Sequence, residues 1–187
     1  MRRHIAALAV AALSAAACGG GGGTAAGSDP AAPSAPATAP AVPTASANGA
    51  KVAGPLKFTG TTLDGRQYDG AALAGKPVVF WFWAPWCPKC QGEGPAVAKS
   101  AAKYGDEVAF VGVAGLDKSK AQMDRFVRRT GTTGLIHLDD RDGALYRHFK
   151  VTSQSSYVFV DPSGASHRAT GPLGEAELSR LVAAHAK

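Results

Sequence analysis

The chain has 187 residues, a formal net charge of +6 and three cysteines, so it is long enough for one ordinary domain and one further segment. Its basic residues are scattered, except for Arg125, Arg128 and Arg129 on one predicted helix. A solvated helix face accounts for that group better than a nucleic-acid site does, and we expect no nucleic-acid partner.

The start of the chain has the features of an export signal, which we place at residues 1–17. Two arginines precede an apolar run that is too short for a stable membrane-spanning helix. Cys18 follows three alanines, as in a lipobox, where the cysteine is acylated and becomes the mature N-terminus. Lipoboxes usually carry leucine nearer to the cysteine than Leu13 lies, so ordinary cleavage after the alanines is the alternative. In either case we expect export, with a lipid anchor on Cys18 as the preferred interpretation.

Residues 18–50 are predicted to form a disordered tether. Glycine, alanine, serine, threonine and proline dominate this stretch, and Val42 is its one sizeable apolar residue. Such a segment cannot bury enough surface to offset the entropy lost on ordering. We therefore place the folded domain at residues 51–187. Outside the cytosol an odd third cysteine would be a free thiol, and lipidation of Cys18 accounts for it.

The folded part alternates between strand and helix patterns. Apolar–polar alternation around Asp64-Gly65 predicts a hairpin over 56–68, and the apolar run 77–83 predicts a strand buried on both faces. Further strands are predicted over 108–113, 135–138, 157–160 and 167–170, and helices over 88–104, 118–129, 143–149 and 174–186. This order predicts an α/β fold with a central mixed sheet covered on both faces.

The motif Cys87-Pro88-Lys89-Cys90 lies where the 77–83 strand meets the helix that follows. Cys87 is then the N-cap and Pro88 the first helical residue, a position that proline favours. The Cys87 sulfur would face the free N–H groups of Lys89 and Cys90 at the positive end of the helix dipole. Both effects, and the charge of Lys89, favour a thiolate. Cys90 returns to the same face one turn later, within disulfide distance.

A catalytic dithiol–disulfide pair therefore explains this motif best, with Cys87 as nucleophile and Cys90 as resolving thiol. A purely structural disulfide is less favoured, because its loop would be too short to constrain the unfolded chain. A zinc site would need further ligands, and no ligand spacing is found among the four histidines of the predicted folded part, His137, His148, His167 and His185. We expect no metal and no cofactor. Glu93, one turn further, is a possible proton acceptor, or else an exposed acid that complements the helix dipole.

The stretch FWAPWCPKC, residues 82–90, resembles the active site of the thioredoxin superfamily. Pro95 matches a proline inside the family's first helix, and Glu93 matches an acid of the TlpA/ResA-like branch. With FVGVAGLD and YVFVDPSG, the tethered chain resembles exported DsbE/DsbF-like lipoproteins. The resemblance implies a thioredoxin fold with an N-terminal β-hairpin and a helix-and-strand insertion over 118–149. It also implies thiol-disulfide oxidoreductase activity, with Trp86 and Lys89 beside the cysteines.

Two positions depart from the family pattern. Trp81 stands where thioredoxin carries a buried acid, which favours an oxidant or isomerase, although Glu93 could partly substitute. Ser155 stands at the position of the family's cis-proline, so Gln154 and Ser155 are expected in the substrate-binding loop. Either the bond between them is trans and the loop differs, or strain is held there. A serine hydroxyl beside the sulfurs could also stabilise a thiolate.

We therefore predict an extracytoplasmic thiol-disulfide oxidoreductase at the outer face of the cytoplasmic membrane. Its partners would be exported proteins with reduced cysteines and a membrane redox partner that reoxidises the enzyme. Two alternatives stay open. The first reverses the direction, so that the protein reduces an apocytochrome or another enzyme. The second is a non-catalytic thioredoxin-like module that binds a metal or a partner through the two cysteines.

Overall fold

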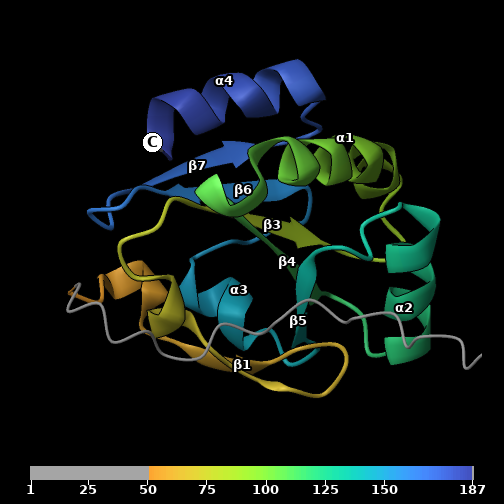
Figure 1. The fold of residues 1–187 in the computed structure, drawn as a ribbon. Helices are drawn as coiled ribbons and strands as arrows, with labels where there is room; N and C mark the ends of the chain where they lie inside the picture. The colour runs from red at the N-terminus through yellow and green to blue at the C-terminus, as the bar shows by residue number, and fades with distance from the viewer. Residues whose placement is uncertain (1–50, 187) are drawn as a thin grey trace, which may run out of the picture. The chain divides into compact units, whose positions relative to one another are not determined.

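The structure, a computed structural model, describes residues 51–186 (Figure 1). The predicted export signal, the tether and Cys18 lie outside the described residues, so these expectations stay predictions. Within residues 51–186, none of the helices combines the length and the apolar character needed to cross a membrane.

A five-stranded sheet with the strand order β5-β4-β3-β6-β7 forms the centre of the domain. β3 pairs in parallel with β4, and β4 with β5, whereas β6 runs antiparallel to both β3 and β7. The strands are β3 (Val78–Trp83), β4 (Ala109–Gly115), β5 (Ile136–Asp140), β6 (Ser156–Val160) and β7 (Ser166–Thr170). The prediction of a mixed sheet with a thioredoxin-type arrangement is confirmed.

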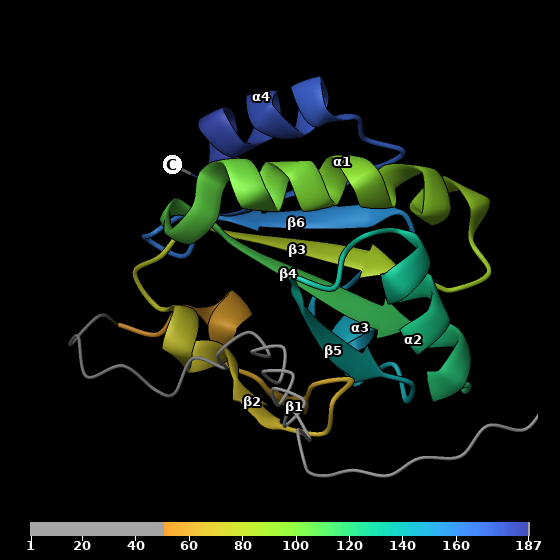
Figure 2. The ribbon, with the colours of Figure 1, turned by 45° about the vertical axis from the view of Figure 1, so that its right-hand side comes forward.

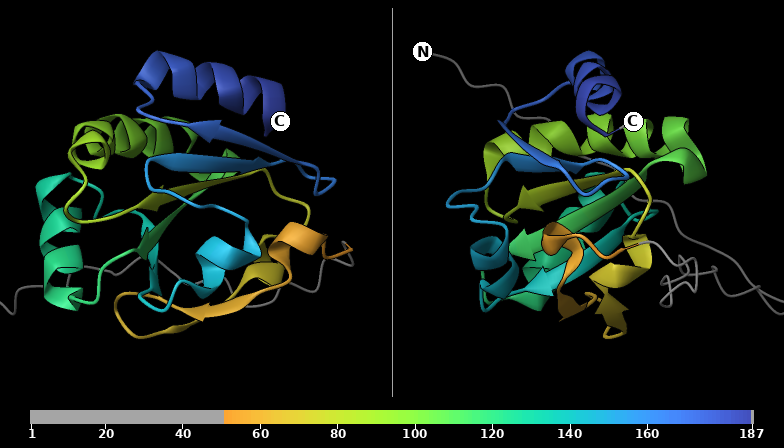
Figure 3. Two further views of the ribbon diagram at one scale, coloured as in Figure 1. Left: turned by 180° about the vertical axis from the view of Figure 1, so that it is seen from behind. Right: turned by 90° about the vertical axis from the view of Figure 1, so that its left-hand side faces the viewer.

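Helices and a hairpin cover the two faces of this sheet (Figure 2). One face carries α1 (Pro88–Tyr104) and α4 (Glu175–His185), which lie side by side, and side chains of α2 (Lys120–Arg129) join the same core. The other face carries α3 (Ala144–His148) and the antiparallel hairpin of β1 (Thr59–Thr61) and β2 (Gln67–Asp69). Figure 3 shows α4 above β6 and β7 from behind. Three short 3-10 turns complete the described part of the chain: η1 (Gly54–Leu56), η2 (Gly70–Leu73) and η3 (Gly105–Glu107).

Every side chain of β3 is fully buried, as the apolar run predicts. Val79, Trp81 and Trp83 belong to the core under α1, α2 and α4. The alternate residues Val78, Phe80 and Phe82 belong to the core against the hairpin and α3. A strand packed on both faces cannot shift without opening two cores, so β3 holds the residues that follow it in a fixed position.

The predicted insertion over 118–149 supplies α2, β5 and α3, and β5 is the edge strand of the central sheet. The helix begins at Lys120, two residues later than predicted, because Ser119 is its N-cap and accepts a hydrogen bond from the Gln122 N–H. The hairpin is tied to this edge by a β-bridge between Thr62 and Leu138.

Candidate active site

Cys87 caps the N-terminus of α1, as its sequence position predicts. Its backbone is extended (φ −79°, ψ 114°), and its sulfur accepts a hydrogen bond from the Cys90 N–H at 3.1 Å. Pro88 occupies the first turn, where its missing N–H leaves no partner unsatisfied. Of the two N–H groups expected at the sulfur, only that of Cys90 makes a hydrogen bond within the described residues. The sulfur therefore lies at the positive end of the helix dipole.

A disulfide joins Cys87 to Cys90, with 5.3 Å between their Cα atoms. Cys90 is completely buried and Cys87 is 3% exposed. A reacting thiolate approaching from solvent can therefore reach only the Cys87 sulfur. Lys89, between the two cysteines, is exposed. The roles of Cys87 as nucleophile and Cys90 as resolving thiol stay predictions, and the complete burial of Cys90 is consistent with them.

An exposed apolar pair flanks the disulfide. Trp86, immediately before Cys87, is 50% exposed, and its indole N–H donates to the Leu116 carbonyl oxygen at 2.9 Å. Leu116, in the loop after β4, is 44% exposed and has a positive φ of 56°. Large exposed apolar side chains beside a reactive disulfide suit contact with apolar segments of an unfolded polypeptide.

Glu93 is buried on α1, with 2% of its surface exposed, so the alternative of an exposed first-turn acid is wrong. Its Oε1 accepts hydrogen bonds from the Ser155 hydroxyl at 2.9 Å and the Leu173 N–H at 2.8 Å. Its Oε2 accepts one from the Trp81 indole N–H at 3.3 Å. A carboxyl group therefore lies buried behind the disulfide, and three separate segments hold it in place.

Trp81 takes part in this arrangement rather than merely replacing an acid. The Trp81 indole N–H donates to a carboxylate, Glu93, that comes from α1. Burial, and then the neighbouring Glu93 carboxylate, raise the pKa of Tyr157, so this phenol stays protonated at physiological pH. Gly171 lies against the same group, because a Cβ there would come within 1.9 Å of Glu93 Oε1 and 2.3 Å of Ser155 Oγ.

The loop at Ser155 differs from a cis-proline loop. The bond between Gln154 and Ser155 is trans, and the cis bond within the described residues is Gly171–Pro172. Ser155 is buried and has a φ of 51°, a strained conformation for a residue with a side chain. The sequence suggested that the Ser155 hydroxyl could stabilise a thiolate. In the structure this hydroxyl donates its proton to Glu93 instead. Gln154 is half-buried beside it.

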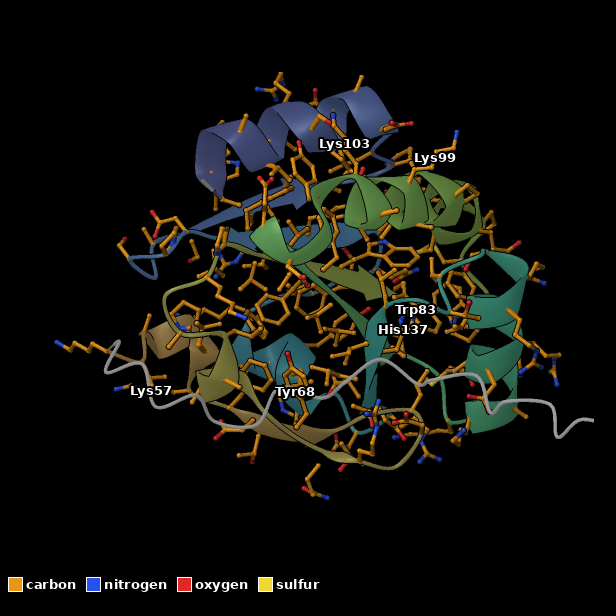
Figure 4. All side chains as sticks on the ribbon, viewed as in Figure 1. Lys57, Tyr68, Trp83, Lys99, Lys103 and His137 are labelled. Atoms are coloured by element: carbon orange, nitrogen blue, oxygen red, sulfur yellow. A yellow bond between two sulfur atoms is a disulfide. The ribbon has the colours of Figure 1, made fainter. Side chains whose placement is uncertain are left out.

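The four histidines of the described residues make contacts within the domain. His137 is buried between the Trp83 indole N–H (3.2 Å to Nδ1) and the Thr132 carbonyl oxygen (2.9 Å to Nε2). Figure 4 shows Trp83 and His137 next to each other. Burial lowers the pKa of His137 to about 4, so the ring is neutral near pH 7. His148 contacts the Pro55 carbonyl oxygen, and the rings of the exposed His167 and the half-buried His185 stack with 3.7 Å between centroids.

Four residues of the site lacked a clear signal in the sequence. Leu116 is a large apolar residue between a glycine and an aspartate in a loop, a pattern that could have indicated an exposed contact. Gly171-Pro172 marks a turn but not what the turn surrounds. Leu173 acts through its backbone N–H, which no residue type reveals.

Residues 51–170 match the AhpC/TSA family. The chain belongs to this family. This AhpC/TSA family protein is 40% identical over 132 residues to the soluble secreted antigen MPT53 of Mycobacterium tuberculosis, covering 69% of this chain and 75% of that one.

Two solved structures are similar to it. One is MTB DsbF in its mixed oxidised and reduced forms, 46% identical, with a TM-score of 0.68 over 72% of this chain and 98% of that one. The other is a secreted Mycobacterium tuberculosis disulfide oxidoreductase described as homologous to E. coli DsbE, 39% identical, with a TM-score of 0.65 over 70% of this chain and 97% of that one. With the Cys87–Cys90 disulfide, these likenesses confirm the predicted class, a thiol-disulfide oxidoreductase.

Proposed function

We propose that this AhpC/TSA family protein oxidises pairs of cysteines in exported, unfolded proteins, on the outer face of the cytoplasmic membrane. The observation that carries the proposal is the place of the Cys87 sulfur, which caps α1 and accepts the Cys90 N–H. The positive end of the helix stabilises a thiolate more than a disulfide, because only the thiolate is charged. The reduced form is thereby stabilised, which makes the disulfide a stronger oxidant.

The proposed reaction transfers two electrons from substrate to enzyme. A substrate thiolate attacks the Cys87 sulfur, the Cys87–Cys90 bond breaks, and Cys90 leaves as a thiolate that takes up a proton. A second substrate thiolate then attacks the substrate sulfur of the mixed disulfide. The new substrate disulfide is released and Cys87 leaves as a thiolate. The enzyme is now reduced, and a membrane redox partner must remove two electrons and the proton of Cys90 to restore the disulfide.

Several neighbours have distinct proposed roles in this cycle. Glu93 is the proposed proton acceptor when Cys90 is reoxidised, since it lies one turn beyond Cys90 and is buried with it. Trp86 and the exposed cation of Lys89 flank the entry to Cys87. Gln154 and Ser155 occupy the loop position at which relatives of the thioredoxin type contact substrate.

The decisive experiment is the reduction potential of the pair, measured by equilibrating the purified domain with glutathione buffers. A value near that of DsbA, about −120 mV, supports the oxidase. A value near that of thioredoxin, about −270 mV, reverses the direction and supports the reductant. In a Cys90→Ser variant, Cys87 is first converted to a mixed disulfide with 5-thio-2-nitrobenzoate. A reduced, unfolded substrate with a single cysteine should then attack the Cys87 sulfur, release thionitrobenzoate, and accumulate as a mixed disulfide with Cys87. A protein that traps no substrate and binds stoichiometric metal would instead be the non-catalytic module.

The proposed location has its own test. If Cys18 carries the lipid anchor, then the wild-type protein sediments with membranes and a Cys18→Ala variant is released from them. Release of both forms into the medium would show ordinary cleavage and a secreted protein.

A further inference from the structure

A pocket of about 360 Å³ lies at the end of the sheet where β4 begins, whereas the disulfide follows the opposite, carboxyl end of β3. Its walls are mainly apolar and come from both sides of the sheet, including Leu73, Val111, Phe110, Leu135 and Ile136. Cavities of this size and character are typical of sites for small molecules. The redox centre does not use this region.

The pocket exists because β5 is shorter than its neighbour at this end. β4 pairs with β3 from Ala109 onward, but its pairing with β5 begins only at Val111 opposite Ile136. Ala109 and Phe110 therefore have a neighbouring strand on one side only, and both residues line the pocket. The missing start of the edge strand leaves the space that the pocket occupies.

Tyr68 brings a buried donor to this pocket. The residue lines the pocket and is 2% exposed, yet its hydroxyl has no hydrogen-bond partner among residues 51–186. Its ring is held by stacking on Phe58, with 6.3 Å between centroids, and in Figure 4 it rises from the hairpin toward the sheet. Burial and the nearby Asp69 raise the pKa of Tyr68, so the hydroxyl stays an uncharged O–H donor. An unpaired buried hydroxyl is costly, and an acceptor atom on a ligand would remove that cost.

The charges around the pocket constrain the ligand further. Lys76 and Asp106 are its only charged lining residues within the described part of the chain, and their formal charges cancel. A strongly charged ligand would find no net attraction there, and its burial among apolar side chains would be unfavourable.

We propose that this pocket binds a small, uncharged, mainly apolar molecule whose carbonyl or ether oxygen accepts a hydrogen bond from Tyr68. The apolar body of the ligand fills the space beside β4, and its oxygen satisfies the buried hydroxyl. This site is independent of the proposed disulfide chemistry, since it stands on residues at the other end of the sheet.

Two probes of nearly equal shape test the proposal. Acetophenone carries a carbonyl oxygen where α-methylstyrene carries a methylene group, so the pair differs mainly in the acceptor. Each is titrated into the purified protein, and binding is followed by the backbone amide shifts of Phe110 and Gly134. We expect saturable binding of acetophenone. Relative to α-methylstyrene, its affinity should fall roughly fivefold in a Tyr68→Phe variant, which loses one hydrogen bond.

The Tyr68→Phe variant should fold at least as stably as the wild type, because it removes an unpaired buried hydroxyl and keeps the ring. Gly134→Leu provides a block at the pocket wall, since a Cβ at this residue meets nothing within 4 Å. It should abolish the binding of both probes.

Two outcomes overturn the proposal. One is the absence of saturable shifts with acetophenone in the wild type, which would show that the pocket holds only water. The other is an equal ratio of affinities in the wild type and Tyr68→Phe, which would show that the hydroxyl recognises nothing. Disulfide exchange at Cys87, measured on the same variants, should stay unchanged. A change in that rate would contradict the independence of the two sites. The direction of the redox reaction is tested separately, by the reduction potential of the cysteine pair.

Discussion

Trp81 and Trp83 lie on the same face of β3, yet their indole N–H groups serve two different buried polar centres. Trp81 donates to Glu93, which Ser155 and Leu173 also contact; we call these four residues the Glu93 centre. Trp83 donates to His137, whose other ring nitrogen contacts the Thr132 carbonyl oxygen; we call these three the His137 centre.

The two centres differ in what they connect. The Glu93 centre joins the helix that carries the disulfide to the loops before β6 and α4, so we expect a change there to affect the redox site. The His137 centre joins β3 to the edge strand β5, and Phe126 stacks on Trp83 beside it at 4.2 Å. The same residue type on the same strand face therefore contacts the proposed proton acceptor at one position, and it joins two strands of the sheet at the other.

Breaking the Glu93 centre should have the largest effect. A Glu93→Ala variant leaves the Trp81 indole N–H, the Ser155 hydroxyl and the Leu173 N–H unpaired in the core. We expect the free energy of unfolding to fall by roughly 3–6 kcal/mol, measured in urea with the disulfide intact. Reoxidation of Cys90 should also slow. Gln91→Ala, which loses one hydrogen bond to Pro85, is the control and should change stability by less than about 1 kcal/mol. An equally small loss of unfolding free energy in Glu93→Ala would show that the Glu93 centre does not stabilise the fold.

Acid should weaken the His137 centre first. Between pH 6.5 and about 4 the unfolded chain binds a proton at His137 that the folded protein does not bind. The free energy of unfolding therefore falls as the pH decreases through this range, by up to roughly 3 kcal/mol from this residue, and is unaffected by it above pH 6.5. A His137→Gln variant, whose amide can still accept from Trp83, should lack this part of the pH dependence. Parallel curves for the two proteins would show that another group is responsible.

The local parts of this comparison could be predicted from the sequence. The apolar run of β3 and Pro88 after Cys87 are short-range signals, and they placed the buried strand, the start of α1 and the disulfide correctly. The partners of Glu93 could not be predicted, because Ser155 and Leu173 lie far along the chain. Only the assembled sheet brings them to Glu93.

The backbone conformation at Ser155 could not be predicted from the sequence either. Alignment placed Ser155 where relatives have a cis-proline. It left two alternatives: a trans bond between Gln154 and Ser155, or strain held at this loop. The structure has a trans bond together with a positive φ, which the Glu93 hydrogen bond and the Gly171 N–H to the Ser155 carbonyl (2.7 Å) hold in place. A backbone angle of this kind depends on tertiary contacts, so the presence of a serine does not predict it.

Two glycines give a matched pair of smaller changes. In Gly171→Ala the new Cβ would come within 1.9 Å of Glu93 Oε1, and in Gly112→Ala within 2.1 Å of His137 Nδ1. Each should lower the free energy of unfolding by about 1–3 kcal/mol through overpacking. Only Gly171→Ala should also change the rate of thiol exchange at Cys87, measured by stopped-flow with a reduced peptide. If Gly112→Ala alters that rate equally, the two centres are not separate in function.

Ser155→Ala is the gentlest test of the same division, because it removes a single hydrogen bond and keeps a Cβ at the strained φ. We expect a loss of about 1 kcal/mol in the free energy of unfolding. Ser155→Pro is the matched comparison: proline fixes φ near −65°, far from the 51° of Ser155, so this loop must rearrange. The proline variant should therefore change substrate trapping by Cys87 more than the alanine variant does. Both changes are made in the Cys90→Ser background. If both leave trapping unchanged, then the Ser155 loop does not contact substrate, and Glu93 is connected to the redox site through α1 alone.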